Sequence, residues 1–218
     1  MARALRLAAR GRCTTHPNPR VGCVLVRDGR ILAEAWHERA GGLHAEAAAL
    51  ARLEESAAGA TAYVTLEPCS HEGRTPPCAP ALVEAGVARV VVPALDPDPR
   101  VSGRGAAILR AAGIAVDIGP LAAEARALNA GFFSRMETGR PRILVKLAAS
   151  LDGRTAMASG ESRWITAAEA RADVHRLRAE CSAVLSGIGT VLADDPSLTV
   201  RLEDRESGGR QPLRVVLD

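Results

Sequence analysis

The feature that most constrains the fold of this chain is the pair Asp28-Gly29, which separates two short apolar runs at residues 21–27 and 31–37. An Asp-Gly pair in this position predicts a two-residue β-hairpin. Farther along the chain, Ala- and Leu-rich helical stretches alternate with short apolar strands. We expect strands at residues 21–27, 31–37, 60–66, 87–93 and 114–118, and helices at 5–11, 44–56, 78–85, 103–112 and 121–130. This order favours a three-layer α/β/α sandwich, with helices on both faces of a mixed sheet.

A second pattern begins after Thr138-Gly139-Arg140-Pro141, so we expect one domain at residues 1–140 and another at 141–218. Asp152-Gly153 predicts a turn, and Thr166 is a suitable N-cap for a helix. The expected elements are strands at 142–149, 183–186 and 213–217, a helix at 167–179 and a tight loop at 187–189. Because the sequence stops within a strand, we expect this second α/β domain to be incomplete.

Composition argues against several classes of protein. The net charge is only +3 with scattered Arg residues, and aromatic residues are 2% of the chain, so little material is present for binding nucleic acid. Five Cys, an odd number, in a chain without a secretory signal argue against a disulfide framework. No apolar run approaches the roughly 20 residues of a membrane span. We therefore expect a soluble, cytoplasmic protein that binds neither nucleic acid nor membranes.

Four residues in the first half have the chemistry of a catalytic zinc site: His44, Glu46, Cys69 and Cys78. One His and two Cys supply three ligands, which leaves the fourth position of a tetrahedral zinc for water. Glu46 follows His44 by two residues, close enough to reach that water without being a ligand. Water activated by metal, together with a carboxylate that moves protons, is typical of zinc-dependent nucleobase deaminases.

The cysteine spacing departs from the P-C-x-x-C signature of deaminases, because Cys69 and Cys78 are nine positions apart. The residues between them, Ser70-His71-Glu72-Gly73-Arg74-Thr75-Pro76-Pro77, closely resemble the deaminase domain of the bifunctional riboflavin-biosynthesis deaminase/reductase family. The segments Asn18-Pro19-x-Val21-Gly22 and Trp36-His37 resemble it as well. Residues 146–154, 162–166 and 194–201 resemble the reductase domain of the same family. The resemblance extends over essentially the whole chain.

For the first domain, the resemblance implies a cytidine-deaminase-like fold that deaminates a diaminopyrimidinone carrying a ribosylamino 5′-phosphate. It implies one Zn²⁺ bound by His44, Cys69 and Cys78, with Glu46 as the proton shuttle. The positions implied to hold the substrate are Asn18, His37, His71 and Arg74. Lys is common in the family at the position of Arg74, so the charge is kept while a compact ammonium becomes a planar guanidinium.

For the second domain, the resemblance implies part of a dihydrofolate-reductase-like α/β fold that uses NADPH to reduce the ribosyl chain to ribityl. The implied NADP-contacting residues are Ala148, Trp164, Thr190 and Asp194. The implied substrate-contacting residues are Lys146, Ser162, Arg178, Leu198 and Arg201. We expect the 218-residue chain alone to bind NADPH poorly and not to catalyse the reduction. The resemblance implies a small phosphorylated pyrimidine as the partner, and it is compatible with a homo-oligomer.

Two alternative interpretations stay open from the residues. One is a tRNA adenosine deaminase or a free-nucleobase deaminase of the same fold, against which the long Cys69–Cys78 spacing, the weak charge and the few aromatic residues argue. The other is a zinc-binding module without catalytic activity. Against it stands Glu46, because a structural zinc site normally has four protein ligands and no use for a free carboxylate beside an open position.

Overall fold

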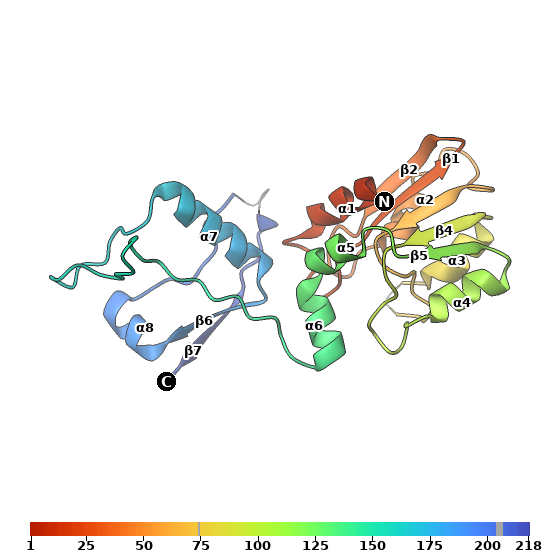
Figure 1. Ribbon diagram of the computed structural model, residues 1–218. Helices are drawn as coiled ribbons and strands as arrows, with labels where there is room; N and C mark the ends of the chain where they lie inside the picture. The colour runs from red at the N-terminus through yellow and green to blue at the C-terminus, as the bar shows by residue number, and fades with distance from the viewer. Residues whose placement is uncertain (74, 204–206) are drawn as a thin grey trace. The chain divides into compact units, whose positions relative to one another are not determined.

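The computed structural model describes residues 1–73, 75–203 and 207–218. The chain forms two compact units, Met1–Arg142 and Ile143–Asp218 (Figure 1). Each unit is a mixture of helices and strands. Among the described residues, no helix is both long and apolar enough to cross a membrane.

A five-stranded mixed sheet with the order β2-β1-β3-β4-β5 organises the first unit. Its strands are β1 (Gly22–Arg27), β2 (Arg30–Trp36), β3 (Thr61–Val64), β4 (Arg89–Val92) and β5 (Ala115–Ile118). The β1–β2 pair is the predicted hairpin, with Arg27 opposite Arg30 and the Asp28-Gly29 pair at the turn in positive φ. β1 is antiparallel to β2 and β3, while β3, β4 and β5 run parallel. The parallel half therefore brings the carboxyl ends of β3 and β4 to one edge.

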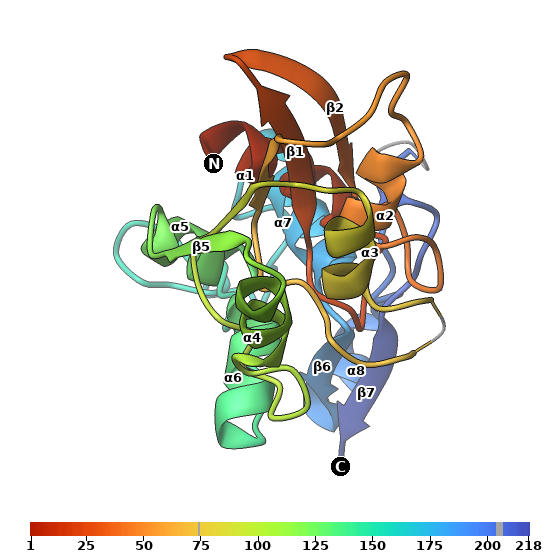
Figure 2. The ribbon, with the colours of Figure 1, turned by 90° about the vertical axis from the view of Figure 1, so that its right-hand side faces the viewer.

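Helices cover both faces of this sheet, so the predicted three-layer α/β/α architecture is confirmed. They are α1 (Ala2–Ala8), η1 (Ala9–Gly11), α2 (Ala45–Leu50), α3 (Cys78–Glu84), α4 (Arg104–Ala111), α5 (Ala122–Leu128) and α6 (Ala130–Thr138). Side chains alternate along β1: Cys23 and Leu25 join the main core, whereas Val24 packs with Ala4 and Leu7 of α1. In Figure 2, α1 and α2 lie on opposite sides of β1 and β2.

The main core is built from small aliphatic side chains, as the scarcity of aromatic residues requires. Alanines of α2 and α3 pack there with Leu82, Val90, Val92 and Leu109, and each of these four is at most 1% exposed. The helix predicted at 44–56 is shorter in the structure and ends at Leu50. The chain turns after Ala51, and the Arg27 guanidinium donates hydrogen bonds to the carbonyls of the segment that follows.

The helix predicted at 121–130 is present as α5, which ends at Leu128, and a second helix, α6, which the sequence analysis did not predict, follows it after Asn129. The Asn129 side chain accepts a hydrogen bond from the Arg20 N–H (2.8 Å) and donates one to the Arg20 carbonyl (2.9 Å). This reciprocal pair occupies both polar atoms of the side-chain amide. Two helices are thereby attached to the segment that leads into β1, a long-range contact that local propensity does not encode.

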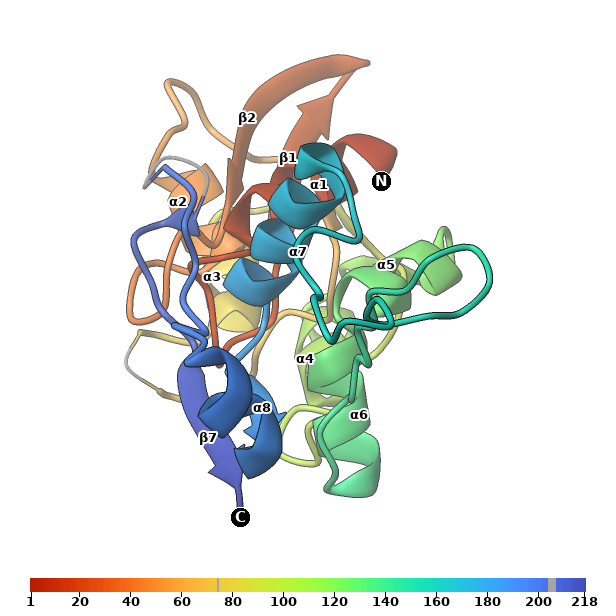
Figure 3. The ribbon, with the colours of Figure 1, turned by 90° about the vertical axis from the view of Figure 1, so that its left-hand side faces the viewer.

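The second unit contains α7 (Ala168–Glu180), α8 (Ile188–Asp194) and a parallel pair of strands, β6 (Ala183–Gly187) and β7 (Leu213–Leu217). Figure 3 shows α8 beside β7. The helix 167–179 and the strands 183–186 and 213–217 were predicted. Among its described residues, those that are buried are Ala179, Val200, Ser207 and Pro212. Most large apolar side chains of this unit are exposed.

Three local predictions for this unit are wrong. Residues 142–149 form no strand, because a strand needs a partner and none lies beside them among the described residues. Ile188 begins α8, so residues 187–189 are a strand-to-helix junction and not a loop. The residue at the N-cap of α7 is Ala167 and not Thr166. The turn predicted at Asp152-Gly153 is present, with the Gly153 N–H bonded to the Ser150 carbonyl.

Candidate metal centre

The structure brings together three residues that are far apart in the sequence: His44, Cys69 and Cys78. His44 is the N-cap of α2, and Cys78 is the first residue of α3, directly after Pro77. Cys69 lies beyond the carboxyl end of β3, and its carbonyl accepts a hydrogen bond from the Ala79 N–H (3.0 Å). Two helix starts and one strand end thus converge at one edge of the sheet.

The distances between the ligand atoms fit a tetrahedral zinc ion. His44 Nδ1 lies 3.5 Å from the sulfur of Cys69 and 3.4 Å from the sulfur of Cys78. Ordinary Zn–N and Zn–S bond lengths at a tetrahedral angle place the two ligand atoms about 3.6 Å apart. The three donor atoms lie within 4.8 Å of one another. This donor set therefore has the spacing and the chemistry to hold Zn²⁺ while leaving a fourth position open.

The two thiols are crowded enough to differ strongly in acidity. Hydrogen bonds from Cys78 and His44 lower the pKa of Cys69 to about 4, in spite of its burial. The pKa of Cys78 is raised, because it donates to Cys69 and because it is buried beside another negative charge. His44, which bonds to Cys69, has a raised pKa. A divalent cation among these groups removes the repulsion that keeps one thiol protonated.

Glu46 lies in the first turn of α2 and is only 4% exposed. Burial, followed by the charge of Cys69, raises the pKa of its carboxyl to about 7. A carboxyl with this pKa is present in both protonation states near neutral pH, which is the condition for an efficient general acid and base. Glu46 is therefore suited to move protons beside the metal ligands.

His37 and Asn18 form a hydrogen-bonded pair next to the ligand His44. His37 is 3% exposed, and its ring meets that of His44 edge to face, with centroids 5.7 Å apart. Its Nδ1 lies 2.8 Å from the Leu43 carbonyl, and its Nε2 lies 3.2 Å from Asn18 Nδ2. Burial lowers the pKa of His37. Asn18 itself is exposed.

His71 follows Cys69 by two residues. Within the described part of the chain, its Nδ1 is a buried nitrogen for which the structure shows no hydrogen-bond partner. A buried polar atom in this state needs a partner, so the atom is available to a ligand. Arg74, the fourth substrate position predicted from the sequence, lies outside the described residues.

The sequence interpretation missed Glu67, which anchors the Cys69 segment. Its carboxylate is 4% exposed and accepts hydrogen bonds from the backbone N–H groups of Asp96 (3.0 Å), Gly103 (2.9 Å) and Ala106 (3.0 Å). A Cβ at Gly105 would lie 1.9 Å from the Pro68 carbonyl oxygen, so only glycine permits this approach. The one signal in the sequence is an acidic residue that directly precedes Pro68-Cys69 at the end of an apolar strand.

Asp96 is a second buried carboxyl near this segment, 8% exposed. Its Oδ1 accepts the Asp98 N–H at 2.8 Å. Burial is the largest of the effects that raise its pKa to about 6. Asp98 has a lowered pKa instead, because its carboxylate pairs with Arg100.

In the second unit the structure brings together two of the residues predicted to contact substrate, Arg178 and Arg201. Arg178 donates to the Thr199 carbonyl (3.3 Å), and Arg201 donates to the Thr199 hydroxyl (3.3 Å). His175 accepts the Arg201 backbone N–H at 3.2 Å, and burial with the two guanidinium charges lowers its pKa. The two guanidinium groups make a local positive cluster, and His175 beside them is held in its neutral form.

The other residues predicted for this unit are spread over several segments. Trp164 is 71% exposed and stacks with Arg171, whose guanidinium carbon lies 4.4 Å from the ring centroid. Asp194 is the last residue of α8 and accepts a hydrogen bond from Arg163 at its carbonyl. The remaining predicted positions are exposed or half-buried: Lys146, Ala148, Ser162, Thr190 and Leu198.

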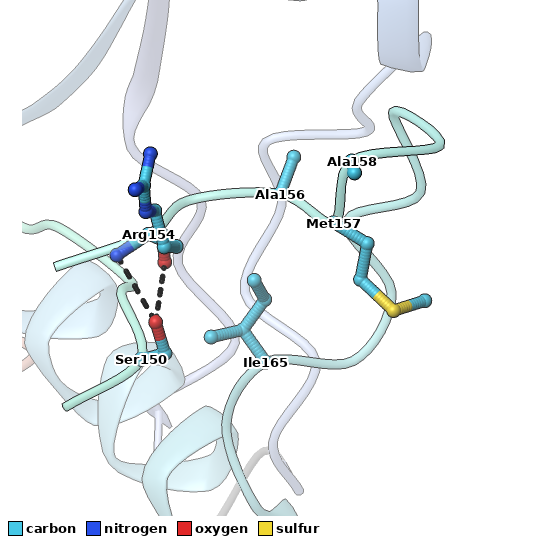
Figure 4. Close-up of a pocket in the computed structure, with 6 residues that line it drawn as sticks. All are labelled: Ser150, Arg154, Ala156, Met157, Ala158 and Ile165. Carbon is cyan, nitrogen blue, oxygen red and sulfur yellow. Dashed lines mark hydrogen bonds between the residues drawn. The ribbon is translucent and has the colours of Figure 1, made fainter. Parts of the chain in front are cut away.

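A cavity of about 520 Å³ lies in this unit, lined by Ser150, Arg154, Ala156, Met157, Ala158 and Ile165 (Figure 4). The Ser150 hydroxyl accepts the Arg154 N–H (3.0 Å) and donates to its carbonyl (3.2 Å), which closes the turn at one side of the cavity. The described lining residues include none of those predicted to bind NADPH or substrate.

Two family models match the chain. The "Cytidine and deoxycytidylate deaminase zinc-binding region" matches residues 1–94, and the "RibD C-terminal domain" matches residues 141–218. The first match contains all three candidate zinc ligands and Glu46. The second contains all of the residues predicted for the reductase.

Known proteins resemble the chain over its whole length. It is 59% identical to the riboflavin biosynthesis protein RibD of Escherichia coli, covering 100% of this chain and 62% of that protein. A solved structure of Acinetobacter baumannii RibD is 54% identical with a TM-score of 0.92, covering 100% of this chain and 61% of that one. A Thermotoga maritima structure, described as a diaminohydroxyphosphoribosylaminopyrimidine deaminase/5-amino-6-(5-phosphoribosylamino)uracil reductase, is 45% identical with a TM-score of 0.93, with shares of 100% and 62%.

The chain thus spans about three fifths of the length of the curated relatives that it matches. The fold, the match to the zinc-binding region and the sequence identity over the whole of this chain all agree with the resemblance found in the sequence. Over its whole length the chain is similar to the RibD riboflavin biosynthesis proteins, with a deaminase zinc-binding region in its first part and a match to the RibD C-terminal domain in its second.

Proposed function

We propose that the first unit of this chain is a zinc-dependent hydrolytic deaminase of riboflavin biosynthesis. Its substrate is 2,5-diamino-6-(5-phosphoribosylamino)pyrimidin-4-one, and its product is 5-amino-6-(5-phosphoribosylamino)uracil. The observation that carries the proposal is the juxtaposition of three metal ligands at tetrahedral spacing with the buried Glu46. The sequence identity to RibD proteins and the activity by which the Thermotoga maritima structure is described support the choice of substrate.

His44, Cys69 and Cys78 would hold Zn²⁺, which would supply the Lewis acidity that makes water a nucleophile near neutral pH. Water adds to the ring carbon that carries the exocyclic amine, the C–N bond breaks, and ammonia leaves. Glu46 takes one proton from the attacking water and gives it to the ring nitrogen, and it then takes the hydroxyl proton of the adduct and gives it to the departing amine. Burial raises the pKa of the Glu46 carboxyl, which favours the protonated form that donates to the departing amine.

Two side chains near the ligands have polar atoms that suit the substrate. The buried Nδ1 of His71 is the nitrogen that a substrate atom would satisfy. Asn18 is exposed and adjoins His44 through His37. Arg74, by its charge, is proposed to contact the ribose or the phosphate. The partner is a small phosphorylated molecule, in keeping with the cytoplasmic location expected from the sequence.

For the second unit we propose the nucleotide and substrate segments of an NADPH-dependent reductase. Arg178 and Arg201 converge at Thr199, where two guanidinium groups can bind the substrate phosphate bidentately. Ala148, Trp164, Thr190 and Asp194 are the proposed NADP contacts. Lys146, Ser162 and Leu198 are proposed to face the ribosyl substrate.

Ammonia release from the pyrimidinone nucleotide tests the deaminase proposal, with Glu46→Gln as the matched variant. We expect the variant to bind one zinc per chain and to lose about 10²–10⁴-fold in kcat, the usual contribution of a general acid–base. If Glu46→Gln kept the full rate while wild-type protein was active, the assigned proton shuttle would be wrong.

The same assay with cytidine, guanine and tRNA separates the alternatives. We expect turnover of the pyrimidinone nucleotide only. Turnover of tRNA or of a free base in its place would favour the other deaminase class. Zinc binding with no turnover of any of these compounds would favour a module without catalytic activity.

A further inference from the structure

We propose that the side chains of Arg6 and Arg10, beside Trp36, form an anion site that binds a phosphate group. Trp36 packs against α1, whereas the next side chain along the chain, His37, contacts the metal ligand His44. Because α1 and α2 lie on opposite sides of β1 and β2 (Figure 2), the site is separate from the metal centre. The proposal goes beyond the proposed deaminase function and does not depend on it.

A cavity of about 250 Å³ lies at this position, lined by Arg3, Arg6, Leu7, Arg10 and Glu34. The three arginines follow one another at i, i+3 and i+7 along α1 and η1, so they share one side of this helical segment. Sites for drug-sized ligands usually measure about 300–1,000 Å³. The smaller cavity is therefore matched to a single phosphate group and not to a whole nucleotide.

The arginines of this cavity outnumber the one carboxylate that lines it. Glu34 accepts hydrogen bonds from both Nε and Nη2 of Arg3, and this pairing is the main cause of its lowered pKa. Arg6 and Arg10 are exposed, and neither forms an ion pair in the part of the chain that the structure describes.

Two guanidinium groups thus retain their donors for an external anion, and phosphate accepts such groups bidentately. Arg6 and Arg10 are also four positions apart in a helical segment, where like charges destabilise the helix. A bound phosphate dianion would offset this repulsion.

The scaffold holds these arginines in place before any ligand binds. The guanidinium carbon of Arg10 lies 4.8 Å from the centroid of the Trp36 ring, and that of Arg52 lies 5.5 Å from it. The helix itself is fixed on β1, because a Cβ at Gly22 would lie 2.1 Å from the Ala4 carbonyl oxygen. A site that is ordered in advance loses less conformational entropy on binding.

Fluorescence of Trp36 in the zinc-loaded full chain reports on the site. The chain has two tryptophans, so Trp164→Phe leaves Trp36 as the single indole emitter. We would add inorganic phosphate, glycerol phosphate, acetate or chloride at equal ionic strength, which holds general screening constant. We expect a saturable change of emission with the two phosphate compounds only, and the tighter of the two identifies the ligand as a phosphate ion or a phosphate ester.

An equal change with chloride would overturn the proposal, because the arginines would then be ordinary solvated charges. An equal change with acetate would overturn the assignment to phosphate.

Variants assign the fluorescence response to the two arginines. Arg6→Gln and Arg10→Gln each remove a charged donor and should weaken phosphate binding about 10–100-fold. Arg135→Gln on α6, another exposed arginine of the first unit, is the matched control and should leave the dissociation constant unchanged. If Arg6→Gln and Arg10→Gln bound phosphate as tightly as the control, the proposed site would be wrong. Neither measurement uses turnover, so failure of the proposed deaminase function would leave this test intact.

Discussion

The two units of the chain contain the same kinds of elements but differ in what those elements bury. In the first unit, a cluster of seventeen buried apolar residues joins both parts of the sheet to α2, α3 and α4. In the second unit, both strands have exposed leucines, such as Leu185 at 60% and Leu213 at 68%. Its extended segment carries Val145 at 75% and Leu147 at 82%.

This difference matters for the chemistry. A catalytic metal centre needs ligands held in position and carboxyls whose pKa is set by burial, and a closed core provides both. Glu46 and Asp96, whose pKa values burial raises, are each less than 9% exposed beside the ligand segment. The arginines of the second unit lie near one another, but the surface around them is open.

Removal of zinc should produce the largest effect, confined to the first unit. At free zinc 1,000-fold above its Kd, binding stabilises the folded state by about 4 kcal/mol, and chelation removes this contribution. We expect ammonia release to stop and hydrogen exchange to speed up in α2 and α3, with no change in α7. Equal acceleration in both units would show that they are one cooperative body.

Truncation of one leucine in each unit compares how much each side chain contributes to the free energy of unfolding. Leu82→Ala in the first unit removes a fully buried side chain and should cost about 2–5 kcal/mol in the free energy of unfolding. Leu185→Ala in β6 removes a side chain that is 60% exposed, and it should change stability by less than about 0.5 kcal/mol. Denaturant unfolding of both variants gives the comparison. A loss above about 2 kcal/mol in the free energy of unfolding for Leu185→Ala would contradict the exposed position of Leu185.

Glu67→Gln tests whether the buried carboxylate anchors the metal segment. A neutral amide has one acceptor atom for three N–H groups, so we expect a loss of about 1–3 kcal/mol and weaker zinc binding. Glu169→Gln, in the first turn of α7, is the matched control because that carboxylate is exposed. Its change should stay below about 1 kcal/mol, the usual interaction with a helix dipole. Equal losses of stability in the two variants would contradict the anchoring role of Glu67.

Asp96→Asn should produce the smallest effect, which depends on pH. The pKa of folded Asp96 is about 6 against 3.8 when unfolded, so its contribution to stability is fully present below pH 3.8 and is lost as pH rises through 6. Asn keeps the acceptor oxygen without the charge. We therefore expect the stability of the variant relative to wild type to rise by about 1.3 kcal/mol between pH 5 and pH 7.

Thermal unfolding at pH 5 and pH 7 measures this gain. Asp173→Asn on the exposed surface of α7 should give the same difference from wild type at both pH values. If Asp96→Asn behaved like Asp173→Asn, burial of Asp96 would not control its protonation.

Much of the first unit follows from local sequence signals. The Asp28-Gly29 turn fixes the hairpin, and period-two alternation along β1 divides Cys23 and Leu25 from Val24. The candidate metal centre was recognisable because its residue types, a His, a Glu two positions later and two Cys, follow one another in the order of a deaminase zinc site. Glu67 was not recognised, because its partners lie 29–39 positions away and are backbone groups with no side-chain signature.

The sequence by itself determined the residue types at the metal centre and the alternation of helices and strands that separates them. Only the tertiary structure decided that His44 Nδ1 lies 3.4–3.5 Å from the two sulfurs, and that His37 meets Asn18 and His44. The physical reason is that propensity and periodicity act over a few residues. Distances between ligands depend on how β3, α2 and α3 pack against one core. Where that packing is absent, as at residues 142–149, an apolar run alone does not make a strand.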